Sequence, residues 1–280
     1  WIVAVPFTPA TGPRILWTKG TSEADREETF DLLTGALPEM CERLGLSSVH
    51  VLFPDAPQVD AFRSRDWAER LGLQFQFANP GYRDFDAFLG SFRAKRRHAI
   101  RRERRSVIES GTRVDVWTGE DLKKLDPRLA YELYLTTVDK YVWGRRYLTP
   151  GFFEKILTTM PDALHFVLAS APGGAPLAGA FNLLGSKALY GRYWDTFGDV
   201  PYLHFEVCLY RGVEESIRRR LERFEPGAGG EHKESRGFLP TIPRSVHHYA
   251  DPRLDALVRD FYRREAQAIV ARANGETDDE

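Results

Sequence analysis

The sequence predicts a mixed α/β fold in which helices flank mostly antiparallel sheets. Two observations support this prediction. In the first 84 residues, segments with helical periodicity alternate with short β-rich runs. From Thr112 the pattern starts again and follows the order β-α-α-β-β-β-α-β-α. We therefore expect a partial first lobe over residues 1–84, a basic connecting helix over residues 85–111 and a complete second lobe over residues 112–273.

The composition is that of a folded protein without a general charge preference. The 280 residues are 42% hydrophobic, which is enough for one large or two ordinary cores. The net charge of −1 argues against a general attraction to nucleic acids or membranes, so any basic surface has to be local. Cys41 and Cys208 lie far apart and form no C-x-x-C pair. This argues against a disulfide framework or a zinc site and suits a reducing cytosol.

The two ends of the chain carry further expectations. The sequence shows no secretory signal and no apolar run of about 18 residues, so we expect a cytoplasmic protein. It opens at Trp1 inside a β-rich run, from which we expect that part of the first lobe is missing. Residues 274–280 are acidic and should form a disordered tail.

Each element of the first lobe follows from a local pattern. Trp1 to Pro6 and Arg14 to Trp17 are β-rich runs joined by a T-P-A-T-G-P turn, which predicts a hairpin. Ser22 to Leu44 carries an apolar stripe at helical spacing. The remaining expected elements are a strand at Ser48–Phe53, a helix at Val59–Leu71 and a strand at Leu73–Phe77.

The second lobe should be built around three consecutive apolar strands. They are expected at His165–Ser170, Pro176–Leu184 and Ala188–Trp194, where short Gly-containing turns connect them. The other expected elements are a strand at Arg113–Trp117, one or two helices in Glu120–Lys140, a short helix within Tyr147–Met160, a helix at about Leu203–Leu221, a strand at Arg223–Pro226 and a last helix at about Leu254–Ala273.

The connecting helix is strongly basic. Between Arg93 and Arg105 there are eight Lys or Arg residues. One interpretation is a surface that contacts the phosphates of an RNA or of a nucleotide-linked substrate. The other is a solvated helix face balanced by acidic residues elsewhere. The residues that we single out as candidate nucleic-acid or phosphate contacts are Arg97, Arg101, Arg102, Arg104 and Arg105.

The stretch from Tyr190 to Phe238 combines aromatic, polar and glycine residues at high density. It contains the strings Y-G-R-Y-W, L-H-F-E, F-E-P-G-A-G-G-E-H-K and R-G-F-L-P. Elsewhere stand R-R-E-R-R at Arg101–Arg105 and W-G-R-R-Y-L at Trp143–Leu148. Together these strings resemble the FemAB-like predicted N-acyltransferases, within the wider superfamily of Fem peptidyltransferases and GNAT acetyltransferases. The matches run in order along nearly the whole chain.

This resemblance implies a GNAT-like fold and the transfer of an acyl group to an amine. The transferred group would be an aminoacyl group from aminoacyl-tRNA, and the acceptor would be an amine of a peptide or peptidoglycan precursor. No tightly bound cofactor is implied. In GNAT-like lobes, backbone N–H groups hold the acyl carbonyl where the fourth strand separates from the fifth. In this chain that point would lie near Tyr190 to Trp194.

Three residues are candidates for acid–base catalysis. Glu206 lies beside the buried stripe of its helix, where a carboxylate has a raised pKa and can serve as a base. Alternatively, Glu206 interacts with the helix dipole or pairs with an arginine such as Arg192. Glu231 and His232 lie in the Gly-rich loop that follows, and His232 is the better candidate by its ordinary pKa.

The same loop resembles an anion-binding cradle, because glycine allows close backbone approach and Lys233 adds charge. A plain connecting turn is the alternative. With these residues we group others that could contact a substrate. The candidate substrate-binding residues are Lys140, Trp143, Tyr190, Arg192, Trp194, His204, Glu225, Lys233 and Arg236. His247 and His248 lack the spacing of metal ligands, and we expect no metal site.

Two alternatives to an aminoacyl-tRNA donor remain open. An acyl-CoA donor is disfavoured, because T-F-G-D-V-P-Y stands where GNAT enzymes have their Gly-rich pyrophosphate loop. The string F-E-P-G-A-G has the glycine spacing but follows one strand too late. The other alternative is a binding module without catalysis, which recognises cell-wall fragments or RNA through the basic helix and an aromatic cleft.

Overall fold

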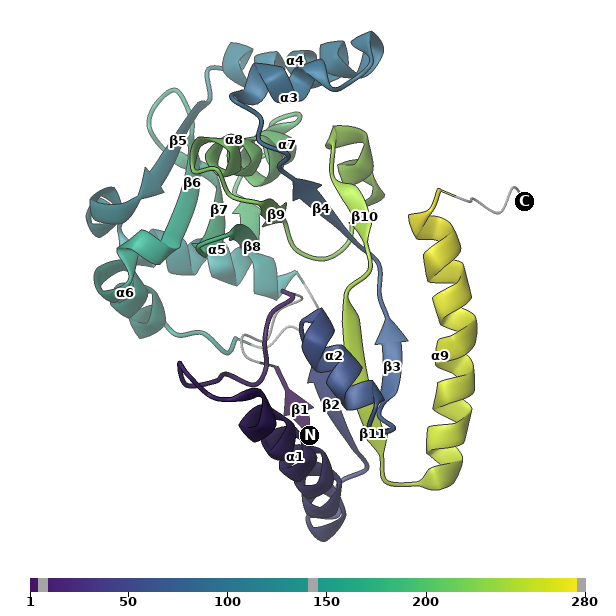
Figure 1. Ribbon diagram of the computed structural model, residues 1–280. Coiled ribbons are helices and arrows are strands. Elements are labelled where there is room, and N and C mark those ends of the chain that lie inside the picture. The colour runs from purple at the N-terminus through teal and green to yellow at the C-terminus, as the bar shows by residue number, and fades with distance from the viewer. Residues whose placement is uncertain (5–9, 141–145, 276–280) are drawn as a thin grey trace. The chain divides into compact units, whose positions relative to one another are not determined.

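The computed structural model describes residues 1–4, 10–140 and 146–275, apart from the side chain of Glu231. These residues form two compact units (Figure 1). The first unit combines Trp1–Gln74 with Pro240–Glu280, and the second consists of Phe75–Leu239.

The first unit is built on a four-stranded mixed sheet in the order β1-β2-β11-β3. β1 (Ile2–Val3) lies parallel to β2 (Ser48–Leu52), and α1 (Glu23–Arg43) connects them. β11 (Arg244–Tyr249) pairs antiparallel with both β2 and β3 (Ala68–Leu71). The other helices of this unit are α2 (Ala56–Arg63) and α9 (Pro252–Ala273).

The second unit contains most of a seven-stranded sheet in the order β10-β4-β9-β8-β7-β6-β5. Its strands are β4 (Gln74–Ala78), β5 (Arg113–Thr118), β6 (Leu164–Ser170), β7 (Pro176–Leu184), β8 (Ala188–Thr196), β9 (Arg223–Glu225) and β10 (Leu239–Thr241). Its helices are α3 (Phe85–Gly90), α4 (Ala94–Glu109), α5 (Pro127–Asp139), α6 (Pro150–Thr159), α7 (Leu203–Phe205) and α8 (Arg211–Arg218). β8 and β9 run parallel, whereas β5 to β8 pair antiparallel with one another.

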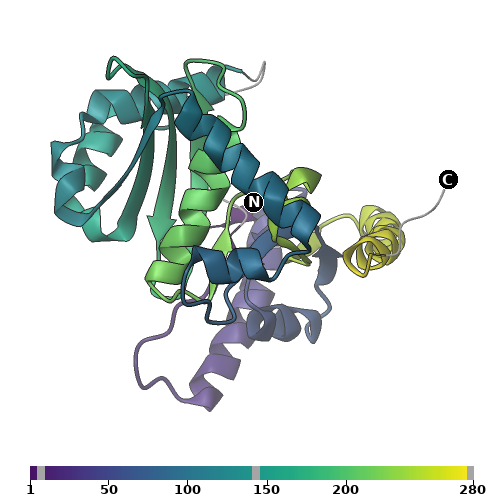
Figure 2. The same cartoon turned by 90° about the horizontal axis from the view of Figure 1, so that it is seen from above.

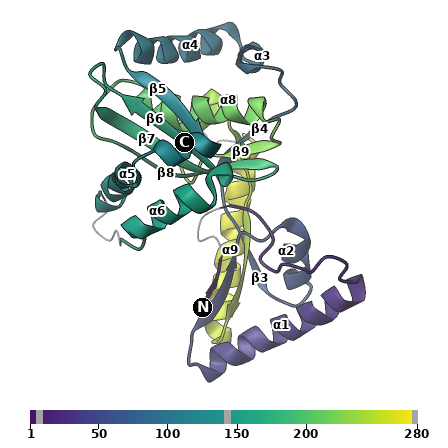
Figure 3. The ribbon, with the colours of Figure 1, turned by 90° about the vertical axis from the view of Figure 1, so that its left-hand side faces the viewer.

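The sheet of the second unit separates two apolar layers. Along β6, Phe166 and Leu168 pack against α5 and α6, while Val167 and Ala169 pack on the other side against Val207. This alternation is the period of two that a strand imposes on its side chains. Accordingly, α5 and α6 cover one face of the sheet and α8 covers the other (Figure 3). The two faces are apolar along Phe166–Ala169, which explains the hydrophobic run in this part of β6.

The division into units differs from the expected lobes. β11 and α9, expected in a second lobe, belong to the first unit, and β4, α3 and α4 belong to the second. The cause is β11, which lies between β2 and β3 and hydrogen-bonds to both. Local sequence does not reveal such pairing, because partners such as His50 and His247 are 197 residues apart.

Two local predictions in the first unit were wrong. Arg14–Trp17 form no strand, and β1 pairs with β2 in place of a hairpin partner. The Arg14 guanidinium instead donates hydrogen bonds to the carbonyls of Ala10, Gly12 and Leu52. The helix expected at Val59–Leu71 ends at Arg63, and the chain turns at Asp66 with a φ of 62° before β3 begins.

The long helices of the second unit are interrupted. The expected basic helix is divided into α3 and α4, and the expected helix at Leu203–Leu221 begins as α7, continues as a π-helical turn at Glu206–Tyr210 and ends with α8. Seen from above, α3 and α4 lie over this helical run (Figure 2). A π-helical turn inserts an extra residue into a helix and is frequent at functional sites.

We expect acid to destabilise the second unit through His165. This side chain is fully buried on β6, and burial lowers its pKa to about 4. The unfolded chain takes up this proton near pH 6.5, whereas the folded chain does not. Stability is therefore complete above pH 6.5 and falls as the pH drops towards 4, by up to about 1.4 kcal/mol per pH unit. Denaturant unfolding at pH 7, 6 and 5 should show a smaller slope for His165→Gln than for the parent, and equal slopes would contradict the assignment.

Candidate active site

A cavity opens in the second unit where β8 and β9 separate. The two strands pair in parallel only from Ala188 and Arg223 to Tyr190 and Glu225. β8 then continues along β7, while the chain leaves β9 through a loop at 226–230. The space between them holds a cavity of about 310 Å³. Its walls come from β7, β8, α5, the helical run 203–210 and the segment 226–233.

A β-bulge shapes the strand side of the cavity. Phe181 of β7 lies opposite Tyr193, but the next residue, Asn182, lies opposite Gly191. Arg192 is therefore the extra residue of the bulge. A bulge takes backbone groups out of the regular ladder and turns the neighbouring side chains. Both effects occur here beside the cavity.

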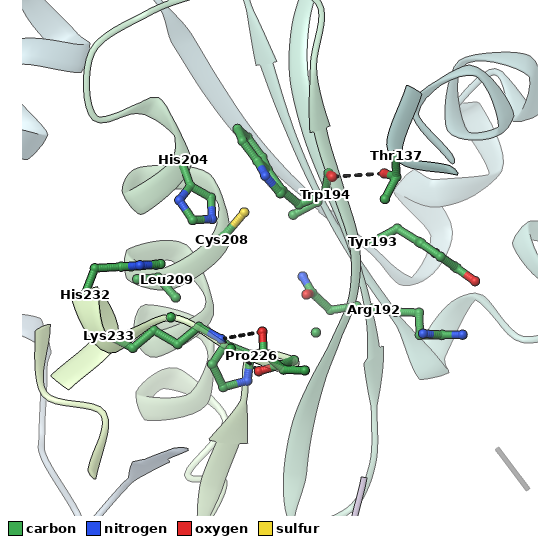
Figure 4. A pocket seen from close by; sticks show the side chains of 17 residues that line it. Thr137, Arg192, Tyr193, Trp194, His204, Cys208, Leu209, Pro226, His232 and Lys233 are labelled. Atoms are coloured by element: carbon green, nitrogen blue, oxygen red, sulfur yellow. Dashed lines mark hydrogen bonds between the residues drawn. The ribbon is translucent and has the colours of Figure 1, made fainter. Parts of the chain in front are cut away.

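The bulge directs the Arg192 side chain away from Lys233, His204 and His232. In Figure 4, the side chains of Arg192 and Tyr193 point to the side of β8 that is opposite Lys233. The Arg192 guanidinium donates a hydrogen bond to the Tyr147 hydroxyl, 3.0 Å away, and lies over the Tyr193 ring. Arg192 is among the residues that line the cavity, but its guanidinium points away from Lys233, so it does not take the substrate-binding role expected from the sequence.

The loop at 226–230 folds around the ammonium of Lys233. Gly227, Gly229 and Gly230 all have φ between 76° and 91°, a left-handed conformation that favours glycine. The Lys233 ammonium donates hydrogen bonds to the carbonyls of Gly227 at 2.8 Å and Ala228 at 3.3 Å. Lys233 is 5% exposed, and burial lowers its pKa to about 8. None of the ion pairs between described side chains includes it.

Two histidines and a thiol complete this side of the cavity. The ring centres of His204 and His232 lie 5.4 Å apart, and the His204 ring also contacts the Trp194 ring at 4.7 Å with an angle of 39° between the two planes. Burial, followed by the positive charges of Lys233 and Arg236, lowers the pKa of His232, and burial lowers that of His204 to about 4. Both imidazoles are therefore neutral at pH 7. The Cys208 thiol lies between His204 and Lys233 in Figure 4.

The close approach of the two strands at the start of the cavity requires glycine. A Cβ on Gly191 would lie 2.9 to 3.0 Å from backbone atoms of Pro226. Because backbone atoms cannot rotate away, we expect Gly191→Ala to lower the free energy of unfolding by about 1–3 kcal/mol. Denaturant unfolding measures this change. Gly35→Ala is the control, because Gly35 lies in α1 with no atom within 4 Å of the added carbon, and there alanine should stabilise by up to about 1 kcal/mol.

Glu206, the base expected from the sequence, is held in ion pairs outside the cavity lining. The Arg104 guanidinium donates to both of its carboxylate oxygens, at 2.9 and 3.0 Å, and Arg211 lies 2.8 Å away. Both carboxylate oxygens of Glu206 are thus bound by guanidinium groups, and Glu206 is not among the residues that line the cavity. The prediction that Glu206 is the catalytic base was therefore not supported by its position. Glu206 begins the π-helical turn, and its side chain points to Arg104 of α4.

The Arg104 side chain is likewise held within the protein, because it donates hydrogen bonds to Glu206 and Glu214. Burial lowers the pKa of its guanidinium, but the hydrogen bonds and charges of Glu206 and Glu214 raise it above its ordinary value. Arg97 is half-buried and donates to the carbonyl of Phe92 at 3.2 Å. The other three candidates on α4, Arg101, Arg102 and Arg105, are exposed.

The Arg236 guanidinium is also hydrogen-bonded to other groups of the protein. It donates two hydrogen bonds to Glu103 of α4, at 2.8 and 3.1 Å, and one to the carbonyl of His232 at 2.8 Å. The Tyr210 hydroxyl donates to the same carboxylate. Arg236 thus supports the 3-10 turn at Glu231–Arg236 and does not line the cavity.

The remaining candidates lie beside the cavity or outside the described residues. Glu225 pairs with Arg223 at 2.7 Å, and Arg223 donates to the Tyr190 hydroxyl at 3.2 Å. Lys140 pairs with the buried Asp195 of β8. Trp143 and the side chain of Glu231 lie outside the part of the chain that the structure describes.

Three lining residues with polar or thiol side chains were missed by the sequence interpretation. Thr137 of α5 donates a hydrogen bond to the carbonyl of Trp194 at 3.0 Å. Asn182 and Cys208 line the cavity from β7 and from the π-helical turn. In the sequence these positions look like parts of apolar core segments, so no local signal distinguished them.

Among the described residues, no cluster of His, Cys, Asp or Glu side chains could hold a metal ion. Within the same ranges, no helix is both long and apolar enough to span a bilayer.

Known structures share this fold. The C-terminal domain of a putative lysylphosphatidylglycerol synthetase from Agrobacterium fabrum matches with a TM-score of 0.57 and 12% identity, over 85% of this chain and 77% of that one. L-PGS from Bacillus licheniformis matches with a TM-score of 0.53 and 10% identity, over 88% and 79% of the two chains. FemX matches with a TM-score of 0.51 and 11% identity, over 83% and 79%. No curated protein matches the sequence.

The two mixed sheets with flanking helices form a mixed α/β fold that FemX shares, and the predicted α/β fold class is confirmed. A family model for FemAB-like proteins of peptidoglycan biosynthesis/recognition matches residues 1–279. The chain belongs to this FemAB-like family.

Proposed function

We propose that the protein is an N-acyltransferase that works in the cavity between β8 and β9. It transfers an aminoacyl group from aminoacyl-tRNA to an amine of a peptide or peptidoglycan precursor. The observation that carries this proposal is the juxtaposition of the β8 bulge with the buried ammonium of Lys233 and the neutral imidazole of His232. Membership of the FemAB-like family supports the acceptor class.

Each step of acyl transfer has a suitable group in the cavity. The amine nitrogen attacks the acyl carbonyl carbon, and negative charge develops on the carbonyl oxygen. Lys233 has three N–H donors, of which two reach the loop carbonyls. The third is available to stabilise that oxygen, together with backbone N–H groups at the bulge.

Proton transfer is assigned to His232. The attacking amine gives up a proton when the new C–N bond forms, and a neutral imidazole can accept it. The ester bond to the tRNA ribose then breaks, and the ribose oxygen takes up a proton. His232 is exposed and lines the cavity, so it can exchange protons with solvent. This assignment replaces Glu206, whose carboxylate is held by Arg104 and Arg211.

The exposed face of α4 is the proposed contact for the donor RNA. Arg102 and Arg105 are exposed on this face, and Arg93 and Lys95 extend it. Arg101 is exposed as well, but its guanidinium pairs with Asp86 of α3 at 3.1 Å. The segment after β8 is poorly suited to bind the diphosphate of CoA, because Asp199 adds negative charge there and Pro201 has no N–H donor. An RNA donor belongs to the cytoplasm, which we propose as the location.

Binding and transfer measured together test the proposal. Aminoacyl-tRNA, deacylated tRNA and CoA are titrated across a salt series, and transfer of labelled aminoacyl groups to peptidoglycan precursor peptides is followed. Arg102→Glu with Arg105→Glu should weaken tRNA binding and reduce the salt slope by about 0.9 for each phosphate that the variant no longer neutralises. Lys155→Glu on α6 is the control, because this exposed lysine lies outside the α4 face.

Either of two results would overturn the proposal. Transfer from acyl-CoA alone would make the protein an acetyltransferase of the ordinary GNAT type. Binding of RNA or cell-wall fragments without transfer from any donor would make it a recognition module.

A further inference from the structure

A polar row crosses the apolar sheet of the second unit and ends at the cavity. Thr118 of β5 lies opposite His165 of β6, His165 opposite Asn182 of β7, and Asn182 opposite Gly191 of β8. The neighbouring positions on this face, Val167 and Ala180, are apolar core residues. Burying polar groups in a core is costly unless they are hydrogen-bonded or functional. The row therefore requires an explanation.

His165 fixes the orientation of Asn182. The two side chains form a hydrogen bond of 2.9 Å between the Asn182 amide nitrogen and His165 Nδ1. His165 is fully buried and Asn182 is 4% exposed. We assign to His165 the tautomer in which Nδ1 accepts from the Asn182 amide and the proton lies on Nε2, which has no hydrogen-bond partner among the described residues. The amide N–H then points to His165, and the amide oxygen is left for another donor.

That oxygen belongs to a residue that lines the cavity. Asn182 lies opposite Gly191, so no side chain on β8 covers it from the neighbouring strand. The charged groups facing His165 come from α8 and the residue that follows it, and they are Glu215, Arg218 and Arg219. Glu215 is paired with both arginines, so it does not compete for Asn182.

We propose that Asn182 receives the attacking amine of the acceptor and that His165 is its positioning residue. This inference rests on the proposed acyl transfer and specifies the acceptor subsite. A carboxamide oxygen accepts one N–H of the amine, which directs the nitrogen lone pair at the acyl carbonyl. A carboxylate at this position would hold the amine as its unreactive ammonium form, whereas a neutral amide leaves it free to attack as the uncharged amine.

The experiment compares two reactions of the same donor. Aminoacyl-tRNA can transfer its acyl group to the acceptor amine or, more slowly, to water. Asn182→Leu should lower kcat/KM for the acceptor amine by about 10- to 100-fold, the usual effect of one buried hydrogen bond, and this loss should exceed any change in donor hydrolysis. Asn182→Asp keeps an oxygen acceptor, and its transfer rate should recover as the pH rises and the amine loses its proton.

A spectroscopic measurement checks the positioning role without any assay of activity. The ¹⁵N NMR signals of His165 should show the Nε2–H tautomer between pH 5 and 8 in the parent protein. Asn182→Leu should change the Nδ1 shift of this histidine. His165→Leu should lower amine transfer more than donor hydrolysis.

The outcomes separate this inference from the proposed function. Unchanged amine transfer in Asn182→Leu would overturn the inference, and so would a parallel loss of amine transfer and donor hydrolysis, because Asn182 would then only support the cavity. A parent protein that neither transfers nor hydrolyses the donor would overturn the proposed function, and the inference with it.

Discussion

Arg236→Met should lower the free energy of unfolding of the second unit by about 3–5 kcal/mol, the usual effect of removing one partner from a buried ion pair. Glu103 and Arg236 are 5% and 7% exposed, and two hydrogen bonds join them. Without the guanidinium, the Glu103 carboxylate keeps only the Tyr210 hydroxyl as a described partner for its charge. The turn that carries His232 and Lys233 also loses the hydrogen bond to its carbonyl. Denaturant unfolding measures the change.

A second variant separates the charge from the packing. Glu103→Gln in the Arg236→Met background leaves no charge at this buried pair, and the amide oxygen of the new glutamine still accepts from Tyr210. We expect this double variant to recover most of the stability lost in the single one. A double variant as unstable as Arg236→Met would show that packing of Arg236 on the Phe205 ring, 3.3 Å from its centre, is the larger contribution.

Lys233→Met should change activity and stability in opposite directions. If Lys233 stabilises the developing oxyanion, its loss should lower the rate of acyl transfer by about 10²- to 10³-fold, the usual effect of one such donor. The same change removes a buried cation whose pKa burial has lowered to about 8. At pH 7 the folded protein bears the cost of keeping this group charged, so methionine should raise the free energy of unfolding.

The pH dependence provides the control for this prediction. The parent enzyme should lose activity as the pH rises through about 8, because Lys233 then gives up its proton. Lys233→Arg keeps the charge, and its activity should not fall in this range, although the larger guanidinium fits the loop less well. A Lys233→Met variant with the parental rate would remove Lys233 from the mechanism.

The sequence predicted those parts of the site that are continuous in the chain. The segment from Pro226 to Lys233 was recognised because its glycines, histidine and lysine stand together and because each residue type has a direct conformational or chemical meaning. Trp194 and His204 were found for a similar reason, since both flank the turn after β8. The lining of the cavity includes Trp194, His204, residues 226–230, His232 and Lys233.

The sequence could not predict which charged side chains face one another. Glu206 and Arg104 are 102 residues apart, and Glu103 and Arg236 are 133 residues apart. Glu206, Arg104 and Arg236 were interpreted as catalytic, RNA-binding or substrate-binding groups, because a charged residue in a sequence carries no sign of its partner. Asn182 was missed for the opposite reason, since a single amide within an apolar strand resembles a tolerated exception.

The place of β11 has a consequence for the order in which the protein is made. A ribosome releases the whole of Phe75–Leu239 before it releases Arg244–Tyr249, so the second unit can fold while the first lacks the strand between β2 and β3. Until then β2 and β3 expose unpaired edges. Nascent chains should therefore need protection at their N-terminal rather than their central segment, and premature termination after about residue 240 should yield a folded second unit attached to an aggregation-prone first one.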